Sequence, residues 1–301
     1  MSTLAPPIPR DLLRISDLQA PSLAALLDLA AVMKSRPHGF VEALRGDTVV
    51  CFFEKPSTRT RVSFAAAAER LGMFPLLIRP DELQLGRGET IEDTARTLSG
   101  YAQAIVVRTY GQEVVEQLAA AAAVPVINAL TDEHHPCQAL ADLLTLRELF
   151  GSLEGLKVAY VGSGSNVASS LAEAGALTGT RVVVACPPGY EPRVDAEIVR
   201  DPREAVAGAH AVYTDVWVSM GEEADREERL SELEPYRVDA ALMAAARDDA
   251  VFMHCLPAHR GEEVTADVID GPRSVVWQQA ENRLPTEEAL LLALVSRRWE
   301  T

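Results

Sequence analysis

The stretch TVVCFFEKPSTRTRVSFAAAAERLG, residues 48–72, predicts a strand, a short loop and a helix. The apolar run from Val49 to Phe53 is typical of a buried strand, and the alanine-rich segment after it is typical of a helix that ends at Gly72. Ser57 is a natural N-cap, because its side-chain oxygen can accept from a free amide of the first turn. A strand followed by a helix is the repeating unit of α/β folds.

Two arginines, Arg59 and Arg61, lie in the first turn of this predicted helix. The free N–H groups and the dipole of a helix N-terminus favour negative charge, so local rules alone would not place cations there. A bound anion removes the conflict, because hydroxyls, amides and arginines at one helix start suit a phosphate group. The alternative is an exposed basic helix end that is held by Glu54 or Glu69.

The composition of the 301 residues indicates a globular protein of about two domains. With 28 basic and 44 acidic residues the formal charge is −16, which argues against nucleic acid or an anionic membrane as partner. The four cysteines are far apart and have no metal-ligand spacing, so we expect free thiols, no metal and a reducing compartment. The N-terminus lacks the layout of a signal peptide, and we expect a cytoplasmic protein without a membrane span.

The first half alternates predicted strands and helices, which favours a mainly parallel sheet covered on both faces. Leucine spacing predicts one or two helices within residues 11–33, and Thr90 with Asp93 predicts another helix start. Further strands are expected at 75–78, 104–107 and 124–127, and further helices at 113–123 and 136–150. A composition change over residues 151–155 predicts domains at 1–150 and 151–301.

The second half opens with a predicted strand at 157–161, a glycine-containing turn and a helix to residue 177. Further strands are expected at 181–185, 211–214, 251–254 and 275–277, and further helices at 222–233 and 240–247. A closing amphipathic helix is predicted at 286–299, and we expect the segment from about 286 to 301 to pack back on the first domain.

The turn Gly162-Ser163-Gly164 invites comparison with the dinucleotide-binding fingerprint. The third glycine of that fingerprint would fall at Val167, and the next strand ends in Cys186-Pro187-Pro188 without an acidic residue for a ribose. A nicotinamide cofactor is therefore not expected. Asn166 could instead hold a small polar ligand, although an ordinary helix start explains it nearly as well.

Most of the unusual polar residues share one predicted location, just past the carboxyl end of a strand. They are Ser57 to Arg61, Arg108, His135, Asn166, Asp215, Cys255 and Arg283. Open α/β sheets bind their ligands at this edge, so two domains that present it to each other would form one cleft.

Each of these residues also has a purely structural interpretation. His135 could polarise a carbonyl or merely cap a helix, and Asp215 could bind an ammonium group or make its own turn hydrogen bonds. Cys255 could be a packing residue. The partner of Arg283 could be Glu281 or a ligand oxygen. Their order along the chain and their shared edge are more informative than any one of them.

Five motifs, taken together, resemble the ornithine carbamoyltransferases over nearly the whole chain. They are Ser57-Thr58-Arg59-Thr60-Arg61, His135-Pro136-Cys137-Gln138, Asp215-x-Trp217-x-Ser219-Met220-Gly221, His254-Cys255-Leu256-Pro257 and Glu281-Asn282-Arg283. The first two also resemble aspartate carbamoyltransferases and imply carbamoyl phosphate, whereas the Ser-Met-Gly and His-Cys-Leu-Pro motifs imply ornithine.

The chain also departs from the family pattern. The turn at 162–166 is Gly-Ser-Gly-Ser-Asn, where the family typically shows Gly-Asp-Gly-Asn-Asn, and the stretch 190–201 looks shorter than usual. A different amine acceptor, such as N-acetylornithine or putrescine, therefore stays open. So does a non-catalytic paralogue that binds phosphorylated ligands.

The resemblance implies a two-domain α/β enzyme with its active site in the interdomain cleft, assembled as a homotrimer or a multiple of trimers and using no cofactor. Such an enzyme transfers the carbamoyl group of carbamoyl phosphate to ornithine, giving citrulline and phosphate in arginine biosynthesis. The implied carbamoyl-phosphate residues are Ser57, Thr58, Arg59, Thr60, Gln84, Arg108, His135, Gln138 and Arg283. The implied ornithine residues are Asn166, Asp215, Ser219, Met220, Cys255 and Leu256. The implied catalytic residues are Arg59, Thr60, Arg108, His135 and Cys255, the last as a pocket residue rather than a nucleophile.

Overall fold

The computed structural model describes residues 7–82, 88–218 and 223–296. The chain divides into two compact units. The first contains the residues up to Leu144 together with those from Asn282 onward, and the second runs from Thr145 to Glu281. Each unit has its own parallel sheet.

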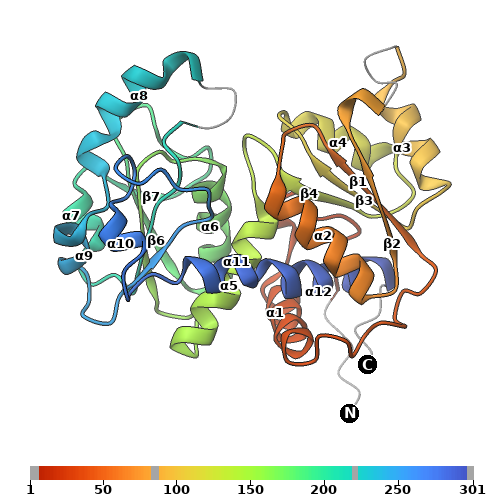
Figure 1. Ribbon diagram of the computed structural model, residues 1–301, viewed down its shortest axis with the longest axis horizontal. Coiled ribbons are helices and arrows are strands. Elements are labelled where there is room, and N and C mark those ends of the chain that lie inside the picture. Colours follow the sequence, from red (N-terminus) through yellow and green to blue (C-terminus); the bar gives the residue numbers. More distant parts are fainter. Residues whose placement is uncertain (1–6, 83–87, 219–222, 297–301) are drawn as a thin grey trace. The chain divides into compact units, whose positions relative to one another are not determined.

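The first unit contains a four-stranded parallel sheet with the strand order β2-β1-β3-β4 (Figure 1). The strands are β1 (Thr48–Phe53), β2 (Phe74–Ile78), β3 (Ala104–Arg108) and β4 (Val126–Leu130). The helical elements are η1 (Ile15–Asp17), α1 (Ala20–Ser35), α2 (Thr58–Arg70), η2 (Pro80–Glu82), α3 (Ile91–Ser99), α4 (Gln112–Ala121), α5 (Pro136–Phe150), which continues into the second unit, and α12 (Arg283–Ser296). Strand β3 is buried along its whole length, as expected where helices cover both faces of a sheet.

The second unit contains a five-stranded parallel sheet with the order β7-β6-β5-β8-β9. The strands are β5 (Lys157–Val161), β6 (Arg181–Ala185), β7 (Glu197–Val199), β8 (Ala211–Tyr213) and β9 (Val251–Met253). The helical elements are α6 (Asn166–Thr178), α7 (Pro202–Val206), η4 (Glu223–Asp225), α8 (Arg226–Leu233), η5 (Glu234–Tyr236), α9 (Ala240–Ala244), α10 (Ala266–Ile269) and α11 (Val276–Glu281). The predicted α/β class with two parallel sheets is confirmed.

Local signals in the sequence placed several elements correctly. Ser57 caps α2 through its side chain, which accepts from the Thr60 amide at 3.3 Å. Thr90 caps α3 in the same way, accepting from the amide of Asp93 at 3.1 Å. Strand β6 has the predicted bounds. The short edge strand β7 was not predicted, and it lies within the stretch 190–201 that looked shortened.

The predicted strand at 275–277 is wrong. Ser274 makes only an isolated bridge to Phe252, and the chain then turns into helix α11. A short apolar run fits a strand or a helix equally well, and the following Gln-Gln-Ala-Glu segment favours a helix. Arg283 is therefore the first residue of α12 rather than a residue that follows a strand.

The predicted closing helix is present, but its start and its burial differ from the prediction. Helix α12 begins at Arg283, three residues before the predicted start, and its described part is buried rather than amphipathic. It lies beside α1 and α2 in the first unit (Figure 1). Even Glu287 and Glu288 are at most 1% exposed. Across the residues that the structure describes, no helix combines the length and apolar character needed to cross a membrane.

Candidate active site

The first turn of α2 follows the carboxyl end of β1 after a short loop. Ser57 holds the Thr60 amide, while Thr58 and Arg59 are exposed and Thr60 is buried. The free amides and the dipole of this helix start attract an anion. The hydroxyl of Thr60 accepts from Arg283 at 3.2 Å, so its own proton can point toward a ligand.

Arg283 is a buried arginine that joins three parts of the first unit. Its Nη1 donates to the Gln138 side-chain oxygen at 3.0 Å, and its Nη2 donates to Thr60. Nε and Nη2 both donate to Oε1 of Glu287, at 2.9 and 2.6 Å. Burial raises the pKa of Glu287, and the charge of Arg283 opposes that shift. The sequence left Glu281 or a ligand oxygen as the partner of Arg283, and the structure adds Glu287, one helical turn further along α12.

Arg108 lies at the end of β3, and His135 lies in the loop between the neighbouring strand β4 and helix α5. The carbonyl of Arg108 accepts from the amide of Glu54, the residue after β1. His135 precedes α5 and is 5% exposed. Burial, and then the positive charges of Arg283, Arg108 and Arg59, hold the pKa of this imidazole well below its usual value. A neutral imidazole surrounded by guanidinium groups can bind a carbonyl oxygen next to a bound anion.

Lys55 was missed in the sequence interpretation. It is only 3% exposed, forms an ion pair with Asp132 and lies 4.3 Å from the centre of the Tyr110 ring. It therefore ties the loop before α2 to the loops after β3 and β4. Its place within the stretch that leads into Ser57 was the signal that could have identified it. Gln84, also predicted for this site, lies outside the described residues.

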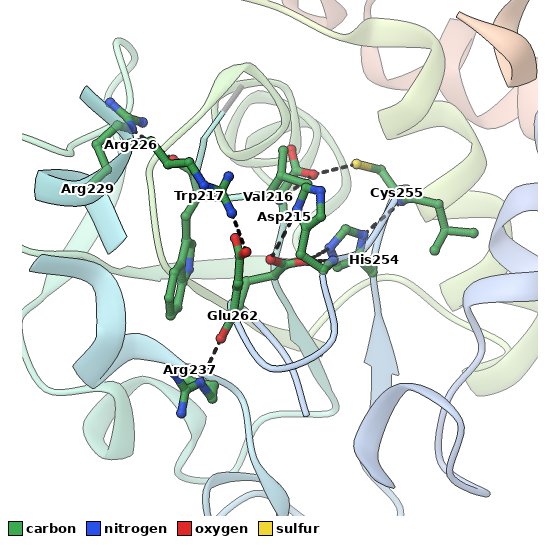
Figure 2. Close-up of polar contacts among 12 residues, drawn as sticks. Asp215, Val216, Trp217, Arg226, Arg229, Arg237, His254, Cys255 and Glu262 are labelled. Atoms are coloured by element: carbon green, nitrogen blue, oxygen red, sulfur yellow. Dashed lines mark hydrogen bonds and ion pairs between the residues drawn. The ribbon is translucent and has the colours of Figure 1, made fainter. Parts of the chain in front are cut away.

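In the second unit, Asp215 and Cys255 meet at the carboxyl ends of β8 and β9. The Cys255 thiol donates to Oδ1 of Asp215 at 2.9 Å, and the amide of Val216 donates to the same oxygen at 2.8 Å (Figure 2). Cys255 is partly exposed, whereas Asp215 is 8% exposed. The pair presents a carboxylate and a thiol suited to a polar ligand with an amine.

The backbone next to Cys255 has an unusual conformation. Leu256 has φ +58°, in the left-handed region, and a cis peptide bond joins it to Pro257. Its amide donates to Nδ1 of His254 at 2.8 Å. The Nε2 atom of that histidine lies 3.2 Å from Oε1 of Glu263. His254 and Glu263 are both buried, and neither was assigned a role from the sequence.

The turn after β5 is close to the segment that follows β8. Gly162 has φ +121°, and a Cβ there would lie 3.1 Å from the indole nitrogen of Trp217, so the position requires glycine. Arg229 links the two segments, donating from Nε to the Trp217 carbonyl at 2.9 Å and from Nη2 to the Ser163 hydroxyl at 3.3 Å. Figure 2 shows Arg229 beside this segment.

Of the remaining residues predicted to bind ornithine, the structure describes Asn166 but not Ser219 and Met220. Asn166 is the first residue of α6, directly after Ser165, whose hydroxyl lies 2.9 Å from that of Tyr160. Both serines of the unusual turn thus contact protein groups. Ser219 and Met220 lie outside the described residues.

Among the residues that the structure describes, two groups of side chains have the composition of a metal site. They are Asp215 with His254 and Cys255, and His259 with Glu262 and Glu263, and within each group the ligand atoms lie within 4.8 Å of one another. In the first group both ring nitrogens of His254 contact protein groups. In the second, Glu262 pairs with Arg226, and Glu263 accepts from His254 and the His259 amide. Both groups are thus engaged in internal hydrogen bonds.

Comparison with known proteins gives one consistent result. The family model described as "Aspartate/ornithine carbamoyltransferase, carbamoyl-P binding domain" matches residues 10–148. The model described as "Aspartate/ornithine carbamoyltransferase, Asp/Orn binding domain" matches residues 154–294.

Individual relatives agree with these matches. The chain is 52% identical to "Ornithine carbamoyltransferase" of Parafrankia sp. (strain EAN1pec), over 95% of this chain and 96% of that protein. It is 50% identical to "Ornithine carbamoyltransferase, anabolic" of Pyrococcus furiosus, over 94% of this chain and 95% of that protein. The crystal structure of ornithine carbamoyltransferase from Thermus thermophilus superposes with a TM-score of 0.89 at 45% identity, covering 95% of this chain and 99% of that one.

Proposed function

Because the chain belongs to the aspartate/ornithine carbamoyltransferase family, we infer that its reaction is that of the ornithine carbamoyltransferases. The carbamoyl group passes from carbamoyl phosphate to the side-chain amine of L-ornithine, giving L-citrulline and phosphate for arginine biosynthesis. We assign carbamoyl phosphate to residues 1–150 together with Arg283, and ornithine to the other site residues of the segment 151–301.

The observation that carries the carbamoyl-phosphate half is the neutral His135 beside three guanidinium groups and the start of α2. A carbamoyl phosphate has an anionic end and a carbonyl end, and this arrangement suits both. We propose that the phosphate lies on the α2 amides and Arg59, with the carbonyl toward Arg108 and His135. The full proposed set is Ser57, Thr58, Arg59, Thr60, Gln84, Arg108, His135, Gln138 and Arg283.

The acceptor half has the groups that an amino acid requires. We propose that Asp215 binds the α-ammonium group of ornithine and that Asn166 binds its α-carboxylate. Cys255 and Leu256 would line the channel for the side-chain amine. Ser219 and Met220 complete the proposed set.

The proposed chemistry needs no covalent intermediate. The ornithine side-chain amine, with a free pKa of about 10.4 like that of lysine, loses a proton and attacks the carbamoyl carbon. Arg108, Thr60 and His135 stabilise the oxyanion that forms, at about 3 to 4 kcal/mol for each well-placed donor. Phosphate then leaves, with its charge balanced by Arg59 and the amides of α2.

The test compares carbamoylation of ornithine, N-acetylornithine, putrescine and aspartate by the wild-type chain and by Arg59→Ala. Arg45→Ala is a matched control, because Arg45 is an exposed arginine of the same unit that belongs to none of the motifs. We expect citrulline from ornithine alone, lost in Arg59→Ala and unchanged in Arg45→Ala. Turnover with another amine only would overturn the acceptor assignment. A folded chain without any turnover would favour the non-catalytic paralogue.

We also propose that the protein is cytoplasmic and that it assembles as a homotrimer or a multiple of trimers. This proposal rests on the family to which the chain belongs. Light scattering coupled to size-exclusion chromatography tests it directly, since the chain mass is 32.5 kDa. A monomer at assay concentration would contradict it.

A further inference from the structure

We propose that Glu263 is a positioning residue for the acceptor pocket, because it fixes the tautomer of His254 and thereby the backbone of Leu256. The inference rests on the proposed function, since it assumes that Cys255 and Leu256 line the ornithine site. The relay consists of Glu263, His254 and Leu256.

The relay is buried and held from several directions. His254 is 1% exposed and Glu263 is 0% exposed. The His254 amide donates to the side-chain oxygen of Gln279 at 2.9 Å, and Gln279 in turn donates to the Tyr213 hydroxyl at 2.9 Å. The imidazole therefore has little freedom to change its position, and its hydrogen-bonding state is set by its neighbours.

The contacts of the imidazole define where its proton lies. The Leu256 amide donates to Nδ1 at 2.8 Å, so Nδ1 must carry a lone pair. A neutral imidazole then has its proton on Nε2, which lies 3.2 Å from Oε1 of Glu263. The Glu263 carboxylate, as an acceptor beside Nε2, selects the Nε2–H tautomer. Without this carboxylate the proton could move to Nδ1, where its N–H would face the N–H of Leu256.

Glu263 also holds the other end of the same loop. Its Oε1 accepts from the amide of His259 at 2.5 Å, so one carboxylate oxygen contacts both His254 and His259. Leu256 lies between these two residues and has φ +58°, which is disfavoured for a branched side chain. Among the described residues it is the only one other than glycine with a positive φ. This loop therefore depends on hydrogen bonds that hold it in place.

The consequence for the site follows from chain order. Cys255 lies between His254 and Leu256, and its thiol contacts Asp215 at 2.9 Å (Figure 2). If Leu256 relaxes, the position of Cys255 relative to Asp215 changes as well. The acceptor pocket should respond, whereas the carbamoyl-phosphate residues, which belong to the first unit, should not.

The test uses two substitutions of similar size. Glu263→Gln keeps a carbonyl oxygen that can accept from His254 and His259, so we expect the KM for ornithine to stay within about twofold of wild type. Glu263→Met removes the acceptor, and we expect that KM to rise about tenfold, the equivalent of one lost hydrogen bond. The KM for carbamoyl phosphate should stay within about twofold in both. Equal effects on both KM values, or none, would overturn the proposal.

A spectroscopic measurement reads the tautomer itself. Imidazole ¹H–¹⁵N correlation spectra, with the His254 signals identified by their loss in His254→Asn, should show Nε2–H in wild type and Glu263→Gln. They should show a population of Nδ1–H in Glu263→Met. An unchanged tautomer in Glu263→Met would overturn the relay. This measurement does not depend on enzyme activity. It therefore tests the contact between Glu263 and His254 even if the wild-type chain makes no citrulline, an outcome that would refute the proposed function but not this contact.

A second pair of variants covers the case in which Glu263→Met does not fold. His254→Asn supplies an oxygen that can accept from the amide two residues on, as in an Asx turn, whereas His254→Leu cannot. We expect His254→Leu to raise the ornithine KM about tenfold and His254→Asn to raise it much less. The same His254→Asn change should lower the raised KM of Glu263→Met. Equal KM values for the two His254 variants would refute the role of the Leu256 contact.

Discussion

The buried pair of Arg283 and Glu287 allows stability and activity to be separated. Their side chains are 4% and 1% exposed, and two guanidinium N–H groups donate to one carboxylate oxygen at 2.9 and 2.6 Å. The informative variants are Arg283→Leu, Glu287→Leu and the double variant. Each single change leaves one charge buried without its partner, whereas the double change leaves an apolar contact.

The magnitudes follow from this geometry. Loss of one partner of a buried ion pair costs about 3 to 5 kcal/mol, which corresponds to a decrease in Tm of about 6 to 20 °C for a unit of this size. Replacing both partners by leucine is neutral or stabilises by about 1 to 4 kcal/mol. Arg283 also donates to Thr60 and Gln138, and those two lost hydrogen bonds cost about 1 kcal/mol each. The double variant should therefore unfold within about 2 kcal/mol of wild type.

The pH dependence has a defined sign. Burial raises the pKa of Glu287 in the folded protein, so its protonated form is favoured by folding. The stability that this raised pKa contributes is present below the unfolded pKa and is lost as pH rises through the folded value. In Arg283→Leu no guanidinium offsets that loss. The destabilisation of Arg283→Leu relative to wild type should therefore be larger at pH 8 than at pH 5.

The assay combines urea unfolding at several pH values with citrulline formation. We expect the double variant to be folded and stable but inactive, because it lacks the guanidinium group that the proposed site requires. A double variant with wild-type turnover would remove Arg283 from the carbamoyl-phosphate site. An Arg283→Leu variant as stable as wild type at pH 8 would refute the argument that the pair is energetically coupled.

Two further outcomes are expected from other buried groups. Burial raises the pKa of Glu288 to about 7, and the charge of Arg70, 3.9 Å away, opposes this shift. Because the folded state favours the protonated carboxyl, the stability that this group contributes is present below about pH 4.5 and is lost as the pH rises to about 7. In urea titrations, Glu288→Gln should therefore stabilise the protein by up to about 3 kcal/mol at pH 8 and by little at pH 4.5. A difference between the two proteins that does not depend on pH would contradict this. A thiol reagent should modify only Cys255, because the other three cysteines are buried and burial raises their pKa values, to about 11 for Cys186. Mass spectrometry should find one label in the wild-type chain and none in Cys255→Ser, and bound ornithine should slow the labelling. Labelling of a second cysteine would contradict the burial of the other three.

Elements whose local signals agree with one another could be predicted from the sequence. The β1–α2 segment combines an apolar run, a capping serine and an alanine-rich helix, and the structure has each of them. Strand β6 lies between turn residues and is strongly apolar, so its bounds were also predictable. The proposed site residues near β1 and β3 could be grouped with one another, and so could those near β8 and β9, because the carboxyl ends of parallel strands within one sheet share an edge.

Contacts between residues distant in sequence could not be predicted in this way. Glu263 is nine residues beyond His254, and nothing in the local pattern indicates that its carboxylate turns inward to the imidazole. Lys55 reaches Asp132 across 77 positions of sequence. Charged side chains are ordinarily exposed, so a pattern-based interpretation places them on the surface unless a buried partner is known.

Helix α12 shows the same difficulty most clearly. Its charged residues suggested a polar face, yet those charges are buried beside α1 and α2. Once Arg283 is placed inside a helix rather than after a strand, Glu287 becomes its partner one turn later, a spacing that the sequence already contained. An arginine that must hold Thr60 and Gln138 in fixed positions needs a fixed orientation itself, and a buried carboxylate provides it. The burial of this helix is therefore tied to the geometry of the proposed anion site, and its apolar pattern alone could not reveal that burial.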